Sequence, residues 1–172
     1  MPAPAYYETL RSLLLQIHRP GKPLVAVEVG AGNGELSKYL LTKVPGLFLH
    51  MIDHWRPIYR DAQVERTEEQ QKEIDRQSDL FKAACKATDF TTERRKIWRM
   101  DPLLAVREFG NFETDLIYLA SADGVSAWWP KVRARGILCG QSQDVKVALG
   151  TTLRNAKPIQ RKGGLWFTYR IE

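Results

Sequence analysis

Several features that mark particular protein classes are scarce or absent in this sequence. It has only two cysteines, Cys85 and Cys139, which lie far apart and lack the spacing of metal ligands. Two distant cysteines indicate free thiols in a reducing compartment rather than a disulfide framework. No apolar run approaches the length of a membrane span, and the first residues lack the charged and then apolar layout of a signal peptide. We therefore expect a cytoplasmic protein without a membrane partner.

The sequence also lacks internal repeats, low-complexity segments and any known nucleic-acid-binding motif. Its 172 residues, 44% hydrophobic and 27% charged, are typical of one globular domain spanning residues 1–172. The net charge of +6 is unevenly placed, because residues 131–172 hold nine Lys or Arg against two Asp or Glu. A solvated basic surface is the simpler explanation of this surplus. A nucleic acid or another acidic partner is the alternative that we keep open.

The most informative stretch runs from Leu24 to Gly34. Leu24–Val29 is apolar except for Glu28, as expected for a strand buried on both faces. Three glycines at every second position follow, and residues 35–41 begin a helix. A strand, a glycine turn and a helix place backbone N–H groups beside a nucleotide-like ligand. A carboxylate at Glu28 is costly in a buried strand unless it meets a partner, and a cationic or multiply hydrogen-bonding ligand would be one.

This motif resembles that of the class I S-adenosylmethionine (SAM)-dependent methyltransferases, which is an acid, one residue and then G-x-G-x-G. The resemblance implies that the turn passes beneath the methionine part of SAM, and that the acid helps to hold the amino group of SAM, usually through water. The residues that it assigns to the cofactor are Glu28, Gly30, Ala31, Gly32, Asn33 and Gly34. The spacing differs from the G-x-G-x-x-G of dinucleotide sites, which argues against an NAD-dependent oxidoreductase. A glycine turn without a ligand remains the alternative.

The second predicted strand, residues 47–53, ends in an acid. Asp53 follows Gly34 at close to the interval at which a carboxylate accepts hydrogen bonds from ribose hydroxyls. A solvated strand-end aspartate is the alternative. His54 is a further cofactor candidate and a candidate base, and Trp55 is a candidate to lie against adenine or to cover a substrate. Each of these two residues has the more ordinary alternative of a packed or satisfied side chain.

The third predicted strand, residues 96–100, ends at Met100 and Asp101, which complete the predicted cofactor residues. The resemblance implies that Asp101 bonds the exocyclic amine of adenine. Asp101 followed by Pro102 is also simply a favourable start for the helix predicted over residues 103–109.

The remaining pattern predicts an α/β fold with a doubly wound, Rossmann-like and mostly parallel sheet of about seven strands, closed by an antiparallel C-terminal hairpin. Residues 59–89 are longer than an ordinary connection and predict a largely solvated helical insert, a lid or an oligomer contact. Residues 128–132 are predicted to belong to a connecting helix. The other predicted elements are a helix over 5–18, strands over 114–120 and 135–140, and hairpin strands over 157–161 and 165–171.

Residues 115–171 narrow the resemblance to the small-molecule methyltransferases sometimes called family 24. The shared order is D-L-I-Y from Asp115, W-W-P-K-V-R from Trp128, G-I-L from Gly136, a helix, and then W-F from Trp166. Members commonly place acids after the fourth and fifth strands, and some use them to bind a divalent cation. Here only Asp123 and Asp144 remain, and both are displaced. We therefore expect no metal site.

This pattern does not identify the catalytic residues. Asp123, His54 and Asp144 are candidate bases by position, and each also has a purely structural alternative. The sequence thus predicts a SAM-dependent methyltransferase that acts on a small molecule. An inactive SAM-binding sensor or partner subunit is the first alternative, because the usual acids are missing. A nucleic-acid methyltransferase is less favoured, since residues 120–123 lack the tetrad of base-amino methyltransferases.

Overall fold

The computed structural model of the protein describes residues 2–56, 66–141 and 153–172. Seven strands form one sheet in the order β3-β2-β1-β4-β5-β7-β6. The strands are β1 (Leu24–Val29), β2 (Leu47–Asp53), β3 (Arg95–Arg99), β4 (Thr114–Leu119), β5 (Val132–Gln141), β6 (Gln160–Lys162) and β7 (Leu165–Tyr169). The first five strands run parallel to one another, whereas β7 pairs antiparallel with both β5 and β6. The α/β fold class and the antiparallel ending predicted from the sequence are confirmed.

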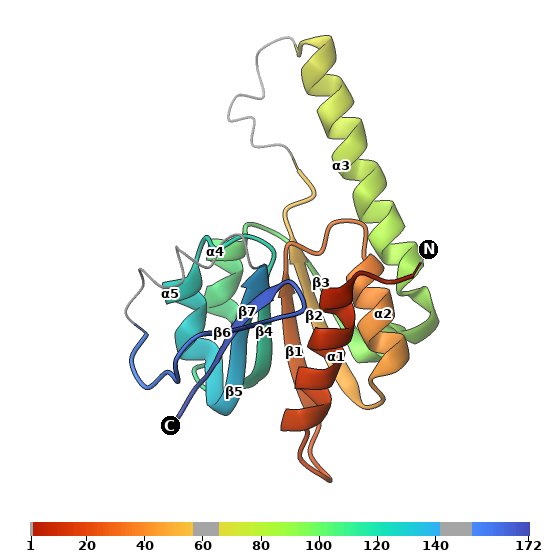
Figure 1. The fold of residues 1–172 in the computed structure, drawn as a ribbon. Coiled ribbons are helices and arrows are strands. Elements are labelled where there is room, and N and C mark those ends of the chain that lie inside the picture. Colours follow the sequence, from red (N-terminus) through yellow and green to blue (C-terminus); the bar gives the residue numbers. More distant parts are fainter. Residues whose placement is uncertain (1, 57–65, 142–152) are drawn as a thin grey trace.

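Helices cover both faces of this sheet (Figure 1). The α-helices are α1 (Ala5–Ile17), α2 (Glu35–Lys43), α3 (Glu68–Ala87), α4 (Pro102–Ala105) and α5 (Val125–Trp128). Short 3₁₀ turns occupy Asp89–Arg94, Val106–Glu108 and Trp129–Lys131. The doubly wound order brings the carboxyl ends of β1, β2 and β4 to one edge of the sheet, where ligands bind in folds of this kind.

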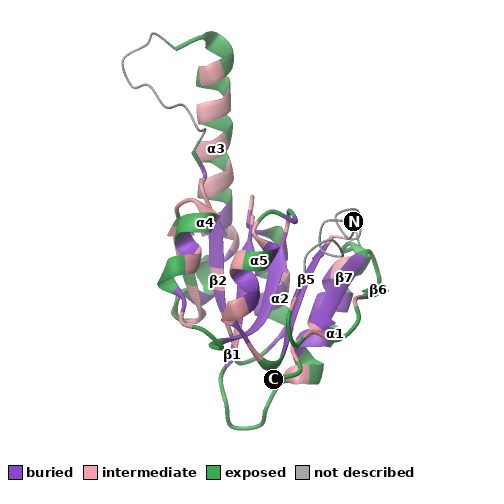
Figure 2. Cartoon of the chain, turned by 90° about the vertical axis from the view of Figure 1, so that its left-hand side faces the viewer, coloured by how far each residue is buried: buried purple, intermediate pink, exposed green. Residues whose placement is uncertain are grey.

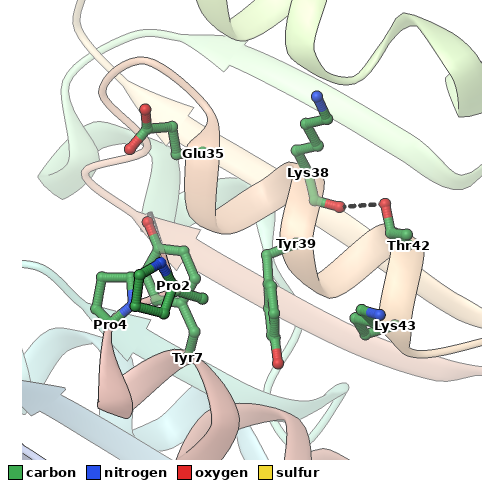
Figure 3. Close-up of a pocket in the computed structure, with 9 residues that line it drawn as sticks. Pro2, Pro4, Tyr7, Glu35, Lys38, Tyr39, Thr42 and Lys43 are labelled. Atoms are coloured by element: carbon green, nitrogen blue, oxygen red, sulfur yellow. Dashed lines mark hydrogen bonds between the residues drawn. The ribbon is translucent and has the colours of Figure 1, made fainter.

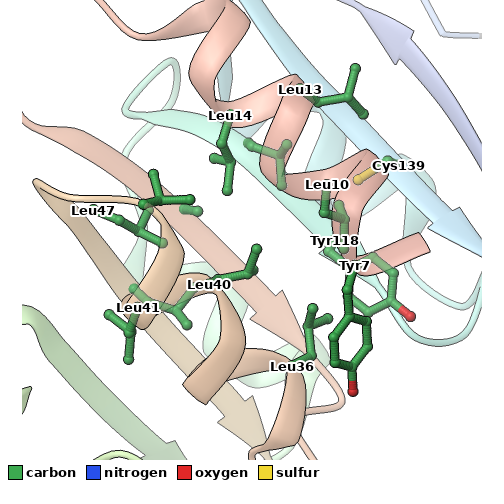
Figure 4. Close-up of a cluster of buried hydrophobic side chains, with 14 of the residues drawn as sticks. Tyr7, Leu10, Leu13, Leu14, Leu36, Leu40, Leu41, Leu47, Tyr118 and Cys139 are labelled. Carbon is green, nitrogen blue, oxygen red and sulfur yellow. The ribbon is translucent and has the colours of Figure 1, made fainter. Parts of the chain in front are cut away.

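Two apolar clusters hold the layers together, one on each face of the sheet. The first joins α1 and α2 to the strands through leucines such as Leu10, Leu14 and Leu40, which are at most 2% exposed (Figure 4). The second packs Phe109, Trp128 and neighbouring residues beneath the opposite face. Alternate residues of β1 enter different clusters, Ala26 the first and Val27 the second, so the strand is buried on both faces as its apolar sequence predicts.

Helix α3 stands out from the body of the molecule (Figures 1 and 2). It begins with a capping box in which Thr67 and Gln70 satisfy each other's backbone N–H groups. Ala84 is its one buried residue, so most of its 20 residues are exposed or half-buried. The predicted helix of the 59–89 segment is therefore present over 68–87, while residues 57–65 lie outside the described part of the chain.

The connecting segment before β5 differs from the prediction. Val132, expected in a helix, begins β5, and only residues 125–131 are helical or 3₁₀ there. The pairing of β4 with β5 jumps from Thr114 opposite Val132 to Leu116 opposite Ile137, so several residues of β5 bulge out of the ladder. The sequence pattern could not show this, because a bulge interrupts the apolar run that marks a strand. The helix expected after β5 lies outside the described residues.

Among the helices of the described residues, none has both the length and the apolar character needed to cross a membrane.

Candidate functional site

A hollow of about 300 Å³ opens at the carboxyl edge of β1, β2 and β4. This volume is at the lower end of the range found for small-molecule sites. It is lined by the last residues of β1 and β2 and by residues that follow β1, β2, β3 and β4: Val29, Gly30, Asp53, His54, Asp101, Pro102, Leu103, Ala120, Ser121 and Asp123. The strand order therefore brings together residues up to 94 positions apart, from Val29 to Asp123.

The glycine turn forms one wall of this hollow. Gly30 has a φ of 90°, and a Cβ added there would lie 2.6 Å from the Cβ of Ala120. Only glycine fits both the conformation and this close approach of β1 to β4. The N–H of Gly30 donates to the carbonyl oxygen of Ile52 at 2.8 Å, which fixes the turn to the end of β2. Gly32 has a φ of 53°, and an added Cβ would meet nothing within 4 Å, so it is the backbone conformation and not a close contact that favours glycine there.

Asp53 is held in place by the backbone of two neighbouring segments. Its Oδ2 accepts a hydrogen bond of 3.0 Å from the N–H of Gly32, and its Oδ1 accepts one of 3.3 Å from the N–H of Trp55. These bonds direct the carboxylate toward the glycine turn. Each carboxylate oxygen has a second acceptor site, so Asp53 keeps the capacity to accept hydrogen bonds from a ligand.

Trp55 is a core residue rather than an exposed platform. It is 1% exposed, and its ring packs against Phe81 of α3 with 5.2 Å between centroids. Its Nε1 donates to the carbonyl oxygen of Gly32 at 2.7 Å. Of the two possibilities for this side chain, the structure supports the packed aromatic.

Glu28 is buried beside the turn and does not line the hollow. It is 3% exposed, and it accepts a hydrogen bond from the hydroxyl of Ser37 in α2. Burial raises the pKa of Glu28 to about 8, the Asp53 carboxylate adds to this rise, and the hydrogen bond from Ser37 opposes it. A cation bound near Glu28 would favour its ionised form.

The end of β3 contributes through Asp101. Its Oδ1 accepts a hydrogen bond of 2.7 Å from the N–H of Leu103 and caps α4, which is the structural role considered for it, and it also lines the hollow. Met100 does not line the hollow. Its side chain packs against the second apolar cluster, and its N–H donates to the carbonyl oxygen of Asp53 at 3.1 Å.

Two of the three candidate bases line the hollow. His54 lies at the end of β2, and Asp123 lies after β4, where its Oδ2 accepts a hydrogen bond of 2.9 Å from the hydroxyl of Ser121. Asp123 is exposed, so its carboxylate is accessible to solvent. The third candidate, Asp144, lies outside the described residues.

The structure therefore brings together five of the predicted residues around one hollow: Gly30, Asp53, His54, Asp101 and Asp123. Ala31 is a core residue, and Asn33 accepts a hydrogen bond of 3.2 Å from the N–H of Glu35. A Cβ added to Gly34 would lie 2.8 Å from the Cα of Ala84, so Gly34 admits α3 against the turn. The sequence predicted no ligand-binding role for the lining residues Pro102, Leu103, Ala120 and Ser121, although each lies at or just after the end of a predicted strand.

The hollow is lined by acidic side chains. Asp53, Asp101 and Asp123 line it, and none of the described residues that line it is a Lys or an Arg. Carboxylates around a partly enclosed site attract a cationic ligand and repel phosphate groups. Within the described part of the chain, no group of three or more His, Cys, Asp or Glu is placed to hold a metal ion.

A second hollow, of about 690 Å³, lies between α1 and α2 (Figure 3). Tyr7 and Tyr39 face it together with Lys38 and Lys43, and the hydroxyl of Thr42 donates to the carbonyl oxygen of Lys38. It is larger than the hollow at the sheet edge, but none of the predicted site residues lines it. We therefore take the sheet edge as the candidate site, since strand ends, glycine turn and carboxylates converge there.

Comparison with known proteins supports this fold. No family model matches the chain, and no curated protein is a significant match. Solved structures do match, among them a protein from Corynebacterium glutamicum with 18% identity and a TM-score of 0.65, covering 100% of this chain and 84% of that one. A proposed caffeoyl-CoA O-methyltransferase from Staphylococcus aureus matches with 12% identity and a TM-score of 0.62, covering 99% and 85%.

A third similar structure is the tRNA methyltransferase TrmI from Aquifex aeolicus, with 12% identity and a TM-score of 0.63, covering 100% of this chain and 70% of that one. Likeness at this identity shows that the chain has the Rossmann-like fold of these methyltransferases. One fold supports many functions, so activity has to be argued from the site.

Proposed function

We propose that this protein is a SAM-dependent methyltransferase that acts on a small-molecule acceptor without a resident metal ion. The observation that carries the proposal is the convergence of the glycine turn with Asp53, Asp101 and Asp123 around a hollow whose lining, within the described residues, includes no Lys or Arg. SAM carries a sulfonium and an amino group, whereas a dinucleotide carries phosphates. The negative site therefore favours SAM over NAD.

The residues present fit this cofactor. Asp53, held by the N–H groups of Gly32 and Trp55, would accept hydrogen bonds from the ribose hydroxyls. Glu28 is a buried carboxyl with a raised pKa, which a nearby amino group would stabilise in its ionised form. Asp101 and Leu103 would lie beside the adenine, and we retain Ala31, Asn33, Gly34 and Met100 as residues that shape the turn and the strand ends around it.

The cofactor supplies a methyl group activated on sulfur for in-line displacement. The chain's own contribution is to position the acceptor and to exclude water from it. An acceptor that must lose a proton also needs a base, and Asp123 and His54 line the hollow for that role. The order of segments from Asp115 to Phe167 supports a relationship to the family 24 methyltransferases. We also propose that residues 1–172 form one domain, with a helical insert at about 59–89.

Titration calorimetry with SAM and with S-adenosylhomocysteine tests the cofactor. We expect micromolar affinity, about 8 kcal/mol, for the wild type. Asp53→Ala should weaken binding by about tenfold or more, because it removes two acceptor oxygens from the site. Asp53→Asn keeps one of these oxygens, so its affinity for SAM should lie between those of the wild type and Asp53→Ala. Asp79→Ala is the matched control, since the side chain of Asp79 is 75% exposed on α3, where it forms an ion pair with Lys82.

Absence of binding by the folded wild type, or equal weakening by Asp53→Ala and Asp79→Ala, would contradict the proposal. A chain that binds SAM and transfers no methyl group to any acceptor would be the alternative of a SAM-binding sensor or partner subunit, which the displaced acids favour. Release of S-adenosylhomocysteine during an acceptor screen separates these two functions.

A further inference from the structure

The end of the sheet opposite the candidate site has a basic hollow of about 570 Å³. It lies where α1 ends, where β5 begins and where the antiparallel β7 ends, and Arg19, Arg133, Arg135, Lys157 and Arg170 line it. Glu172 is the acidic residue of the lining. Strand β4 separates this end of the sheet from the carboxyl edge by about 20 Å, given about 3.3 Å per residue. The basic hollow is therefore distinct from the proposed cofactor site.

Some of these cations are committed to the fold. Arg133 forms an ion pair with the buried Asp115 and donates to the carbonyl oxygen of Ile17 at 3.2 Å. Arg170 donates to the carbonyl oxygen of Trp129 at 2.9 Å, and its guanidinium lies 4.4 Å from the ring of Phe112. These two side chains have little capacity left for a ligand.

Arg135 and Lys157 are exposed and available. Across residues 2–56, 66–141 and 153–172, neither of them makes an ion pair with a carboxylate. Arg19 reaches Asp115 only at 3.7 Å, and its side chain is 55% exposed. Lys157 lies 5.6 Å from the ring of Tyr169, which also lines the hollow. Three cations thus surround a hollow in which Glu172 is the one acidic residue among the lining residues that the structure describes.

The backbone at Arg135 gives independent support. Arg135 has a φ of 63°, a left-handed conformation that glycine adopts easily and other residues rarely do. It lies in the bulge between Val132 and Ile137, where the ladder with β4 is interrupted. Bulges of this kind redirect a side chain, and non-glycine residues in strained conformations gather at functional sites. The fold thus holds a strained arginine at the rim of a basic hollow.

We propose that this hollow binds the phosphate groups of a ligand, with Arg135 and Lys157 as its principal contacts. An arginine guanidinium matches the geometry of phosphate through paired N–H donors, and lysine adds a mobile point charge. The ligand is either a small phosphate compound or the backbone of a polynucleotide. Several basic residues of the C-terminal quarter of the sequence line this hollow. The proposal does not depend on SAM binding.

The test is titration of the full chain with inorganic pyrophosphate and, separately, with a short single-stranded RNA at low salt. Arg135→Gly should weaken binding about tenfold, as expected for one lost charged hydrogen bond, while leaving the Tm unchanged or higher because glycine relieves the strain. Lys157→Gln should weaken binding similarly without a backbone effect. Arg161→Gln is the control, because it removes the same charge from the exposed strand β6, outside the hollow.

Weakened pyrophosphate binding in both hollow variants would identify a small phosphate ligand. Binding of RNA alone, weakened by the same two variants, would identify a polynucleotide. The proposal is overturned if the wild type binds neither probe, or if Arg161→Gln weakens binding as much as the hollow variants do, since charge alone would then explain it.

Discussion

The indole Nε1 of Trp55 donates a hydrogen bond of 2.7 Å to the carbonyl oxygen of Gly32. The N–H of Gly32 in turn donates to Asp53, and the N–H of Trp55 donates to the other oxygen of the same carboxylate. The three residues therefore hold one another, and Trp55 does so at a φ of 46°, which is rare for a bulky residue. Trp55 acts as a positioning residue that ties the glycine turn and Asp53 to the packing beneath α3.

Trp55→Phe should lower both stability and SAM affinity. The smaller ring leaves the carbonyl oxygen of Gly32 without its donor and loses contacts with Phe81, which together should cost about 2–4 kcal/mol of unfolding free energy. The freed turn should also weaken SAM binding several-fold. Urea unfolding and calorimetry measure the two effects.

Trp98→Phe is the control for this prediction. Trp98 also donates through its Nε1, to Nδ1 of His50 at 3.0 Å, but it packs on the opposite face of the sheet. Trp98→Phe should lower the unfolding free energy without changing the affinity for SAM. Equal effects of both substitutions on affinity would show that Trp55 does not position the turn.

The strands around this site follow from the sequence more directly than their surroundings do. Strands β1 and β2 begin and end at the predicted residues, because each is a largely apolar run closed by a glycine turn or an acid. The residues placed at strand ends by motif spacing, Gly30 and Asp53, face one hollow because parallel strands end at a common edge. Their roles toward a cofactor remain predictions.

Features that depend on long-range contacts could not be predicted. The start of β5 depends on a bulge that is stabilised by the pairing of Arg133 with Asp115, 18 residues away. The burial of Trp55 depends on Phe81, which belongs to a helix that the sequence left as lid, insert or contact. Leu103 and Ser121 line the hollow because of how the chain turns after a strand, and no periodic pattern encodes that turn.

Gly30→Ala should distort the carboxyl edge. Its Cβ would lie 2.6 Å from that of Ala120 at a φ of 90°, so β1 and β4 would have to separate. We expect a loss of about 2–4 kcal/mol of unfolding free energy from overpacking and backbone strain together, and reduced SAM binding. Urea unfolding measures the stability.

Gly46→Ala separates these two causes, because Gly46 has a φ of 76° and an added Cβ meets nothing within 4 Å. It should cost about 1–2 kcal/mol through backbone strain alone. If both substitutions cost the same, the contact with Ala120 would not be what requires glycine at position 30.

Asp115→Ala should be among the most destabilising substitutions in the chain. Asp115 is buried, accepts a hydrogen bond of 2.7 Å from the N–H of Val25, and pairs with Arg133. Its removal leaves a largely buried guanidinium unpaired, which we expect to cost about 3–5 kcal/mol in urea unfolding. Asp79→Ala breaks an exposed pair and should cost at most about 1 kcal/mol. A similar small loss for both variants would contradict the structural importance of Asp115.

Glu28→Gln should make stability less dependent on pH. The pKa of Glu28 is about 8 in the folded protein, mainly because of burial, against an ordinary value of 4.5. Between these two values the folded chain binds more protons than the unfolded chain, so the unfolding free energy falls as the pH rises. Each unit of elevation corresponds to about 1.4 kcal/mol, so the whole effect amounts to a few kcal/mol.

The neutral glutamine cannot ionise, so Glu28→Gln should gain stability relative to the wild type as the pH increases from 4.5 to 8, with no further gain above that range. Thermal unfolding across this range measures the difference, and Glu108→Gln, at an exposed position, is the control. SAM should weaken this trend, because its amino group would favour ionised Glu28, and SAM should then stabilise the wild type more strongly at pH 7 than at pH 5, where the amino group stays protonated throughout. A constant difference between variant and wild type at every pH would mean that Glu28 does not titrate in this range.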